Sequence, residues 1–162
     1  MAERIQHYMS LDPKPAPPIE LHDVPSDPRG AGICAFAARD ILKSEIICEY
    51  EGEVISLEEA KRREIIYQEQ GNVCALMVLE SKGSQIAIDP YRGNMTGSEL
   101  TWGATINHSR NNANVKPFVA DKHSTPRVFF VALHDIPETV EFLWNYNDTD
   151  WALYSNSQTL RQ

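Results

Sequence analysis

From Gly30 to Ile136 the chain alternates between short runs rich in Ile, Val and aromatic residues and the Gly, Ser, Asp or Pro residues that end them. β-Branched and aromatic residues favour strands, and the residues that end each run favour turns, so this pattern predicts short antiparallel strands. A mainly β domain of the α+β class is therefore expected. The runs span residues 30–41, 45–56, 72–81, 84–91, 114–120 and 127–136, and a further aromatic stretch spans 140–148.

One main helix is expected to interrupt the strands, between residues 56 and 71. Ser56 followed by Glu59 forms a capping box, acidic residues precede basic ones, and Gly71 ends the segment. The apolar residues do not keep to one stripe, which predicts a half-exposed helix. The basic triplet at 61–63 lies on this helix, where it forms a solvated face or, alternatively, contacts nucleosomal DNA or serves as a nuclear address.

Six of the ten prolines lie in the first 28 residues. Proline fixes φ and lacks a backbone donor, so the segment DPKPAPP at 12–18 forms neither a helix nor an inner strand. We expect a proline-rich arm over 1–28 that dangles or lies along the domain surface, a main domain over 29–151 and a polar tail over 152–162.

The surplus of acidic residues limits the partners. The 162 residues hold 15 Lys and Arg against 23 Asp and Glu, a formal net charge of −8. Such a chain repels phosphate backbones, so strong direct nucleic-acid binding is not expected and a basic protein or peptide suits it better. No apolar stretch reaches the roughly 18 residues that span a bilayer, and the N-terminus lacks a signal-peptide core, which predicts a soluble intracellular protein without a membrane partner.

The three cysteines, Cys34, Cys48 and Cys74, are an odd number at wide spacings, each among apolar or strand-forming neighbours. Buried free thiols are expected at all three positions. No second His or Cys lies at ligand spacing from His108, so no metal site is expected.

Three further patterns have two explanations each. The Gly30-Ala31-Gly32 tripeptide before a strand cradles a ligand or forms a turn. The Asn-His-Ser tripeptide at 107–109 supplies site chemistry or ends a helix. The aromatic residues between 142 and 154 fill a core or line a site. Taken one at a time, each pattern favours the purely structural explanation.

Taken together, in this order and at this spacing, the patterns resemble the SET-domain protein lysine methyltransferases. RGAGICAF is similar to the family's N-terminal G-x-G strand, and EYEGEVIS with EEAKRRE to its second-strand motif and following helix. ATINHSRNNANVKP resembles the R-F-I-N-H-S-x-x-P-N signature, and DIPETVEFLWNYND resembles I-x-x-G-E-E-L-x-x-D-Y-G-D. The resemblance runs from Arg29 to about Trp151 and is strongest to small SET enzymes without cysteine-rich flanks, such as the histone H4 monomethylating type.

The resemblance implies a SET-domain (β-clip) fold of short antiparallel sheets, with a C-terminal pseudoknot that brings residues near 107 and 146 together. It implies a nuclear, chromatin-regulating enzyme that transfers a methyl group from S-adenosyl-L-methionine to a lysine of a basic histone tail. A nucleosome is a further candidate partner.

The resemblance also implies roles for individual residues. Tyr146 matches the catalytic tyrosine, and Tyr50 would line the lysine channel beside it as a second catalytic-site tyrosine, with an ordinary strand tyrosine as the alternative. Trp144 occupies the position whose Phe or Tyr identity is associated with the number of methyl groups that fit. Because Trp is larger than either, mono- or at most dimethylation is expected.

For the cofactor, the resemblance implies contacts along the N-terminal G-x-G strand and at the N-H-S motif. Asn107 and His108 would hold its amino and adenine ends. Trp151 would stack on adenine, or alternatively pack as a tail residue on the domain edge. The cofactor-binding residues expected from the strand are Arg29, Gly30, Ala31, Gly32 and Ile33.

Several positions depart from the family's pattern. Thr105 departs from the Arg-Phe pair before N-H-S, Asn147 replaces the glycine after the tyrosine, residues 137–140 alter the turn before the last strand, and CALMVLE lacks channel tyrosines. These departures favour an alternative, a catalytically silent SET-like module that binds chromatin proteins. A hydrolase built on His108 and Ser109 lacks a nucleophile elbow or oxyanion loop to support it.

Overall fold

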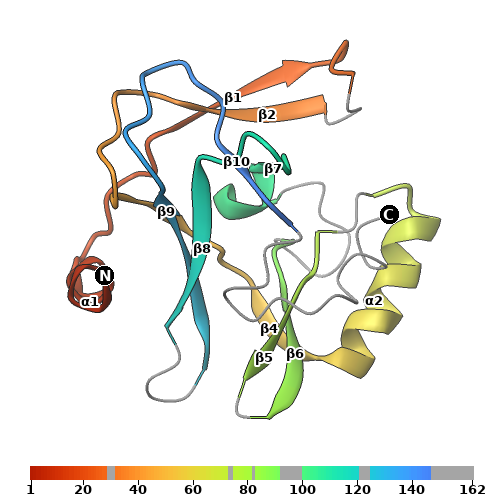
Figure 1. The fold of residues 1–162 in the computed structure, drawn as a ribbon. Coiled ribbons are helices and arrows are strands. Elements are labelled where there is room, and N and C mark those ends of the chain that lie inside the picture. The colour runs from red at the N-terminus through yellow and green to blue at the C-terminus, as the bar shows by residue number, and fades with distance from the viewer. Residues whose placement is uncertain (29–31, 73–74, 82, 92–99, 121–124, 147–162) are drawn as a thin grey trace.

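The computed structural model describes residues 1–28, 32–72, 75–81, 83–91, 100–120 and 125–146. Within these residues the chain is mainly β, as the sequence predicted, with short strands and few helices (Figure 1). The helices are α1 (Ala2–Ser10), α2 (Leu57–Glu69) and the 3₁₀ helix η1 (Trp102–Thr105). The strands are β1 (Ile19–Val24), β2 (Gly32–Ala37), β3 (Ile46–Glu49), β4 (Glu53–Ser56), β5 (Met77–Ser81), β6 (Ser84–Asp89), β7 (Asn107–His108), β8 (Val115–Ala120), β9 (Arg127–Ala132) and β10 (Leu143–Trp144).

The strands form small separate sheets. β1 pairs with β2, β9 lies between β3 and β8, and β6 lies between β4 and β5, all antiparallel. The last sheet is a parallel pair of the two shortest strands, β7 and β10. Since parallel strands need a long connection, this pair joins parts of the chain that are distant in sequence.

Helix α2 begins where the capping box predicts. Ser56 ends β4 and is also the N-cap of α2, where its hydroxyl accepts a hydrogen bond from the Glu59 backbone N–H at 3.1 Å. Ala60 and Tyr67 are fully buried on the side that faces β4 and β6, whereas Ile65 is exposed. The helix is therefore half-exposed, as expected.

Two groups of buried side chains make up the core. The larger lies among β2, β3, β8, β9 and β10 and contains Phe130, Phe142 and Trp144. The smaller lies under α2 and contains Tyr67 and Leu76. Two of the predicted buried free thiols, Cys34 and Cys48, are confirmed, and Cys74 lies outside the described residues.

The N-terminal segment contains more regular structure than its prolines predict. Residues 12–18 form no helix or strand, as expected, but α1 precedes them and β1 follows them. α1 is held by tertiary contacts, because Ile5 is buried and the Tyr8 ring meets the Phe129 ring edge to face at 5.9 Å. The Lys14 ammonium lies 3.7 Å from the Glu49 carboxylate, so the proline segment lies along the domain surface.

The C-terminal strand β10 runs beside β7 and the residues that follow it (Figure 1). The Ser109 N–H donates to the Trp144 carbonyl at 3.1 Å, and the Asn114 N–H donates to the Leu143 carbonyl at 2.9 Å. The expected approach of residues near 107 and 146 is thereby confirmed. None of the helices in the described residues has the length and apolar content that crossing a lipid bilayer requires.

Candidate active site

Tyr146, the expected catalytic tyrosine, is held against residues 106–108. Its hydroxyl donates a hydrogen bond to the Ile106 carbonyl at 3.1 Å, and its backbone N–H donates to Nδ1 of His108 at 3.0 Å. The two rings lie 4.8 Å apart, centroid to centroid. The Asn-His-Ser motif and the tyrosine that follows β10 therefore form one structural unit.

A continuous series of aromatic rings connects Tyr146 to Tyr50. The centroid separations are 4.5 Å from Tyr146 to Trp144, 5.3 Å from Trp144 to Phe130 and 6.2 Å from Phe130 to Tyr50. Trp144 and Tyr50 are 1% and 2% exposed, so both rings are removed from water. The Tyr50 hydroxyl donates to the Ala75 carbonyl. The three residues expected to line a lysine channel therefore lie in one aromatic row, which is buried from Tyr50 to Trp144 and ends at the partly buried Tyr146.

Close backbone packing fixes the position of Tyr50. Its N–H donates to the Val128 carbonyl at 2.8 Å, and a Cβ on Gly103 of η1 would lie 2.9 Å from the Tyr50 Cα. A Cβ on Gly52 would lie only 2.2 Å from the Asp89 carbonyl oxygen, so glycine is required there. The glycine of the EYEGE motif therefore admits the end of β6 next to the tyrosine.

The start of β2 lies beside the Asn-His-Ser motif. The Asn107 amide donates to the Ile33 carbonyl at 2.9 Å and to the Glu141 carboxylate at 3.3 Å. Gly32 has φ +71°, with open space where a side chain would be, and the Ile33 side chain is 51% exposed. Four of the expected cofactor residues thus gather here, namely Gly32, Ile33, Asn107 and His108. The other four, Arg29, Gly30, Ala31 and Trp151, lie outside the described residues.

Asn114 is a site-building residue that the sequence analysis did not single out. Its amide donates to the Glu141 carbonyl at 2.8 Å, and its side-chain oxygen accepts from the Leu143 N–H at 2.9 Å. Only 5% of Asn114 is exposed, so both bonds form away from water. A signal was present, because Asn114 lies one residue beyond the position of the final asparagine in the N-H-S-x-x-P-N signature.

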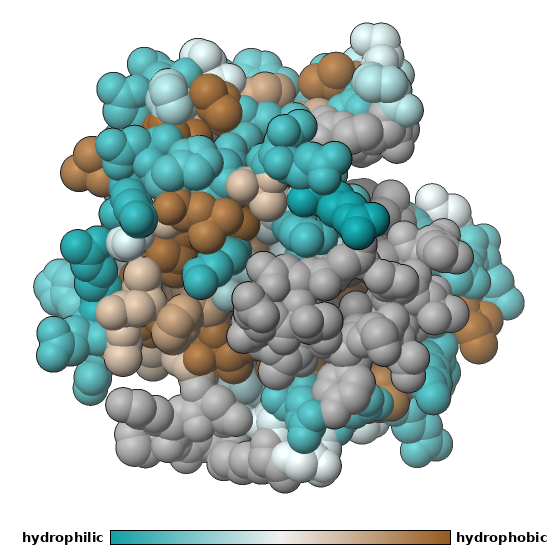
Figure 2. All heavy atoms as spheres, in the orientation of Figure 1, coloured by the Kyte–Doolittle hydropathy of each residue, from teal (hydrophilic) through white to brown (hydrophobic). Residues whose placement is uncertain are grey.

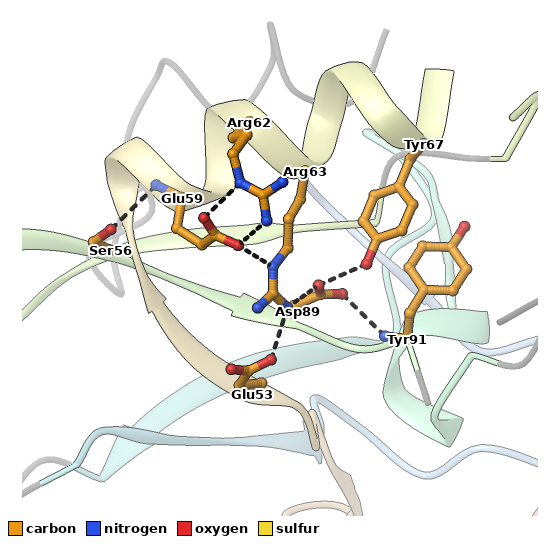
Figure 3. A network of polar contacts seen from close by, with 8 residues as sticks. All are labelled: Glu53, Ser56, Glu59, Arg62, Arg63, Tyr67, Asp89 and Tyr91. Carbon is orange, nitrogen blue, oxygen red and sulfur yellow. Dashed lines mark hydrogen bonds and ion pairs between the residues drawn. The ribbon is translucent and has the colours of Figure 1, made fainter. Parts of the chain in front are cut away.

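A separate polar network joins α2 to β4 and β6 (Figure 3). Arg63 lies 2.7 Å from the carboxylates of Glu53 and Asp89 and 2.8 Å from that of Glu59. The Tyr67 hydroxyl also donates to Asp89, whose side chain is almost fully buried. Burial and this hydrogen bond raise the Tyr67 pKa above its ordinary value.

The same network explains the basic triplet on α2. Arg62 also binds the Glu59 carboxylate, at 2.7 Å and 2.8 Å. Hydrogen bonds from Arg62 and Arg63 lower the Glu59 pKa to about 2, so the carboxylate is charged at neutral pH. Two of the three basic side chains are therefore paired with carboxylates within the chain.

The described residues contain no group of three His, Cys, Asp or Glu side chains placed to hold a metal ion. These residues bring together the aromatic row, the Tyr146 hydroxyl at its end, and the half-exposed start of β2 beside the Asn107 amide. This arrangement can exclude water from an apolar or cationic group and orient it with few hydrogen bonds.

Comparison with known proteins identifies relatives of this chain. Residues 32–147 match the SET domain family. The N-lysine methyltransferase KMT5A of Xenopus tropicalis is 32% identical over 120 residues, which are 74% of this chain and 34% of that protein. Histone-lysine N-methyltransferase EZH2 of Chaetomium thermophilum is 33% identical over 122 residues, 72% of this chain and 7% of that protein.

Solved structures agree. CpSET8 from Cryptosporidium superposes with a TM-score of 0.70 at 30% identity, covering 82% of this chain and 59% of that one. An autoinhibited Chaetomium thermophilum polycomb repressive complex 2 bound to S-adenosylmethionine has a TM-score of 0.67 at 27% identity, covering 90% of this chain and 17% of that one. The SET fold expected from the motifs is confirmed. The chain spans about a third of the length of the curated KMT5A relatives that it matches.

Proposed function

This chain belongs to the SET-domain family, and from that premise we propose that it is a protein-lysine N-methyltransferase that uses S-adenosyl-L-methionine. One observation carries the proposal: Tyr146 ends a buried aromatic row and is tied by its hydroxyl and its N–H to the Asn-His-Ser motif. The catalytic roles that the motifs imply for Tyr146 and Tyr50 are thereby compatible with the geometry.

The proposed reaction needs a neutral lysine amine aligned with a methyl group in a dry site. A lysine side-chain amine has a pKa of about 10.4 in water, and desolvation beside a cation favours its neutral form. Trp144 and Tyr50 would exclude water from the lysine side chain, and the Tyr146 hydroxyl would orient the amine. Nearby carbonyl oxygens such as that of Ile106 would contact the polarised methyl group through C–H···O interactions of about 0.5 to 1 kcal/mol each. Positioning would provide most of the rate enhancement.

The residues present fit the proposed cofactor, which when bound would supply an activated methyl group on a sulfonium ion. Aromatic faces such as those of Tyr146 and Trp144 attract a cation. Asn107 offers an amide, and the open space at Gly32 leaves room for close approach to the backbone at the start of β2. His108 follows Asn107 in the sequence and accepts the hydrogen bond from the Tyr146 N–H. Arg29, Gly30, Ala31 and Trp151 complete the proposed binding set.

For the substrate we propose a lysine of a basic histone tail, free or on a nucleosome, modified in the nucleus. The net charge of −8 favours encounter with a basic segment. The buried Trp144 leaves a narrow row, which favours mono- or at most dimethylation. With Arg62 and Arg63 paired to carboxylates, binding to DNA is not part of the proposal.

A second candidate function is a catalytically silent module that recruits chromatin proteins. Thr105 stands where the family's signature carries phenylalanine, and its hydroxyl donates to the Trp102 carbonyl within η1 at 2.6 Å. The retained Asn107, His108 and Tyr146 favour the enzyme.

The two functions are separated by a binding and a transfer measurement on the same protein. Calorimetry with S-adenosylmethionine comes first, followed by incorporation of its labelled methyl group into core histones. Wild type is compared with Tyr146→Phe and with a matched control, Tyr8→Phe, which removes one hydroxyl on α1.

We expect binding by all three proteins, transfer by wild type and Tyr8→Phe, and a fall of about 100-fold or more in Tyr146→Phe. No cofactor binding by wild type would refute the enzyme, and binding without transfer would favour the silent module.

A further inference from the structure

The His108 imidazole provides the hydrogen-bond acceptor for the Tyr146 backbone. The parallel pairing of β7 with β10 ends at the register pair His108 and Trp144. Two residues beyond Trp144, the Tyr146 N–H points at Nδ1 of His108 at 3.0 Å. A side-chain nitrogen thus holds the backbone of Tyr146 just beyond the paired residues.

We propose that His108 is a positioning residue for Tyr146, and that it acts through an unprotonated Nδ1. The proposal rests on the methyltransferase function argued above and adds a role for the side chain, distinct from any cofactor contact made by the main chain. It assigns the neutral imidazole with its proton on Nε2 as the active form.

Three contacts, one to Ile106 and two to His108, fix Tyr146. The hydroxyl is held by the Ile106 carbonyl at 3.1 Å, the N–H by His108, and the ring by the imidazole 4.8 Å away. The hydroxyl hydrogen bond fixes the position of the end of the Tyr146 side chain, and the N–H hydrogen bond fixes its backbone. Loss of the N–H hydrogen bond would leave the Tyr146 backbone free to move, so the hydroxyl would no longer keep one position.

Protonation of His108 removes this acceptor. The imidazolium carries a hydrogen on both nitrogens, so Nδ1 would then present an N–H to the Tyr146 N–H. Among the described residues, the ionisable groups that contacts bring to this region include the Tyr146 hydroxyl and the Glu141 carboxylate, which binds Asn107 at 3.3 Å. As the pH falls through the titration of His108, Tyr146 loses its positioning bond and turnover falls.

Two substitutions separate the acceptor from the ring. In His108→Asn, the amide oxygen stands as many bonds from Cβ as Nδ1 does, so the variant keeps an acceptor that does not titrate. In His108→Phe, the ring contact is kept without an acceptor. Both are assayed at saturating S-adenosylmethionine on a histone peptide, with separate titrations of cofactor binding.

At saturating cofactor we expect His108→Phe to lower kcat about tenfold, the typical effect of one lost hydrogen bond. His108→Asn should recover most of that loss. Lower pH also protonates the substrate lysine, but it does so for every variant. The ratio of wild-type kcat to His108→Asn kcat should therefore decrease as the pH is lowered, if His108 titrates as proposed. Equal kcat values for the Asn and Phe variants, or a ratio independent of pH, would overturn the proposal.

A readout without turnover separates this inference from the proposed function. Nitrogen NMR of the histidine-labelled chain should show Nδ1 of His108 unprotonated at neutral pH, and exchange of the Tyr146 amide should accelerate as His108 titrates. A protonated Nδ1 at neutral pH, or exchange unaffected by the titration, would refute the positioning role. If wild type transfers no methyl group, the proposed function fails, while these spectra still decide the role of His108.

Discussion

Among the described residues, Trp144 is the largest of the fully buried side chains. In the proposed function, its place in the aromatic row would make it the residue that limits space around a bound lysine. Its ring lies between Phe130 and Tyr146, 5.3 Å and 4.5 Å away. A smaller ring at this position leaves room beside the Tyr146 hydroxyl, where the amine is proposed to lie.

We predict that Trp144→Phe shifts the product toward higher methylation states. The removed atoms leave space for a methylated amine, at a stability cost below the roughly 3 to 5 kcal/mol of replacing a buried Trp by Ala. Mass spectrometry of the peptide product measures the shift. Trp102→Phe, the same change at a 37% exposed position, should keep the wild-type distribution. Identical products from wild type and Trp144→Phe would contradict a channel bounded by this ring.

At the residue scale, the sequence predicts which residues meet but not how they meet. The two C-terminal motifs correctly indicated that Asn107, His108 and Tyr146 come together. The bond from the Tyr146 N–H to an imidazole nitrogen depends on side-chain geometry at a strand end, which no pattern of residue types encodes. Asn114 could have been found from its motif, since a buried asparagine needs partners for both ends of its amide.

At the element scale, α2 is attached to its sheet by the buried Arg63–Asp89 pair rather than by a wide apolar stripe. The Asp89 side chain is 2% exposed and that of Arg63 14%, whereas that of Arg62 is 55% exposed. Both arginines also bind Glu59. The Arg63–Asp89 pair is therefore a buried ion pair that can be compared with the exposed Arg62–Glu59 pair on the same helix.

We predict that Arg63→Ala destabilises the fold by about 3 to 5 kcal/mol, because it leaves the Asp89 carboxylate buried without its cation. Arg62→Ala should cost less than about 1 kcal/mol, as exposed pairs do. Urea unfolding followed by circular dichroism measures both. Equal costs for the two variants would mean that the network does not hold α2.

A second element-scale prediction concerns α1, which covers part of the sheet formed by β3, β9 and β8. Figure 2 shows hydrophobic residues gathered over β8 and β9 on the face drawn there. Ile5 is 2% exposed, so Ile5→Ala should cost about 2 to 5 kcal/mol of unfolding free energy. Met9, 38% exposed on the same helix, is the matched control, and Met9→Ala should change stability little. Comparable losses in the two variants would contradict the packing of α1 described above.

The two helices also differ in how far local sequence predicts them. α2 carries its own start signal in Ser56 and Glu59, and the structure uses it. α1 is a nine-residue helix with no side-chain cap bond, too short to be stable by itself, and depends on Ile5 and Tyr8 reaching a distant sheet. β1 likewise owes its formation to pairing with β2. Tertiary contacts of this kind are not readable from a proline-rich segment.

At the scale of the whole molecule, the proposed function assigns substrate encounter to the net charge and methyl transfer to the aromatic row. The net charge is −8, and the Debye length over which exposed charges act falls from about 10 Å at 0.1 M salt to about 3 Å at 1 M. Attraction of a basic tail is therefore screened by salt, whereas contacts within the buried row are not.

We predict that KM for a basic histone peptide rises with salt concentration while kcat changes little. Steady-state kinetics between low and high salt measure both constants, and a peptide whose flanking basic residues are replaced by neutral ones is the control. The control peptide should have a higher KM and a weaker salt dependence. A salt-independent KM for the basic peptide would contradict a role for the acidic surface in docking.

The central claim is that Tyr146, at the end of a narrow buried aromatic row, directs methyl transfer to a lysine. Its most direct test is mass spectrometry of core histones incubated with S-adenosylmethionine and either wild type or Tyr146→Phe. We expect wild type to add mainly one methyl group, at most two, to a lysine, and Tyr146→Phe to add about a hundredth as much or less. Mainly trimethylated lysine from wild type, or equal methylation by Tyr146→Phe, would contradict the claim.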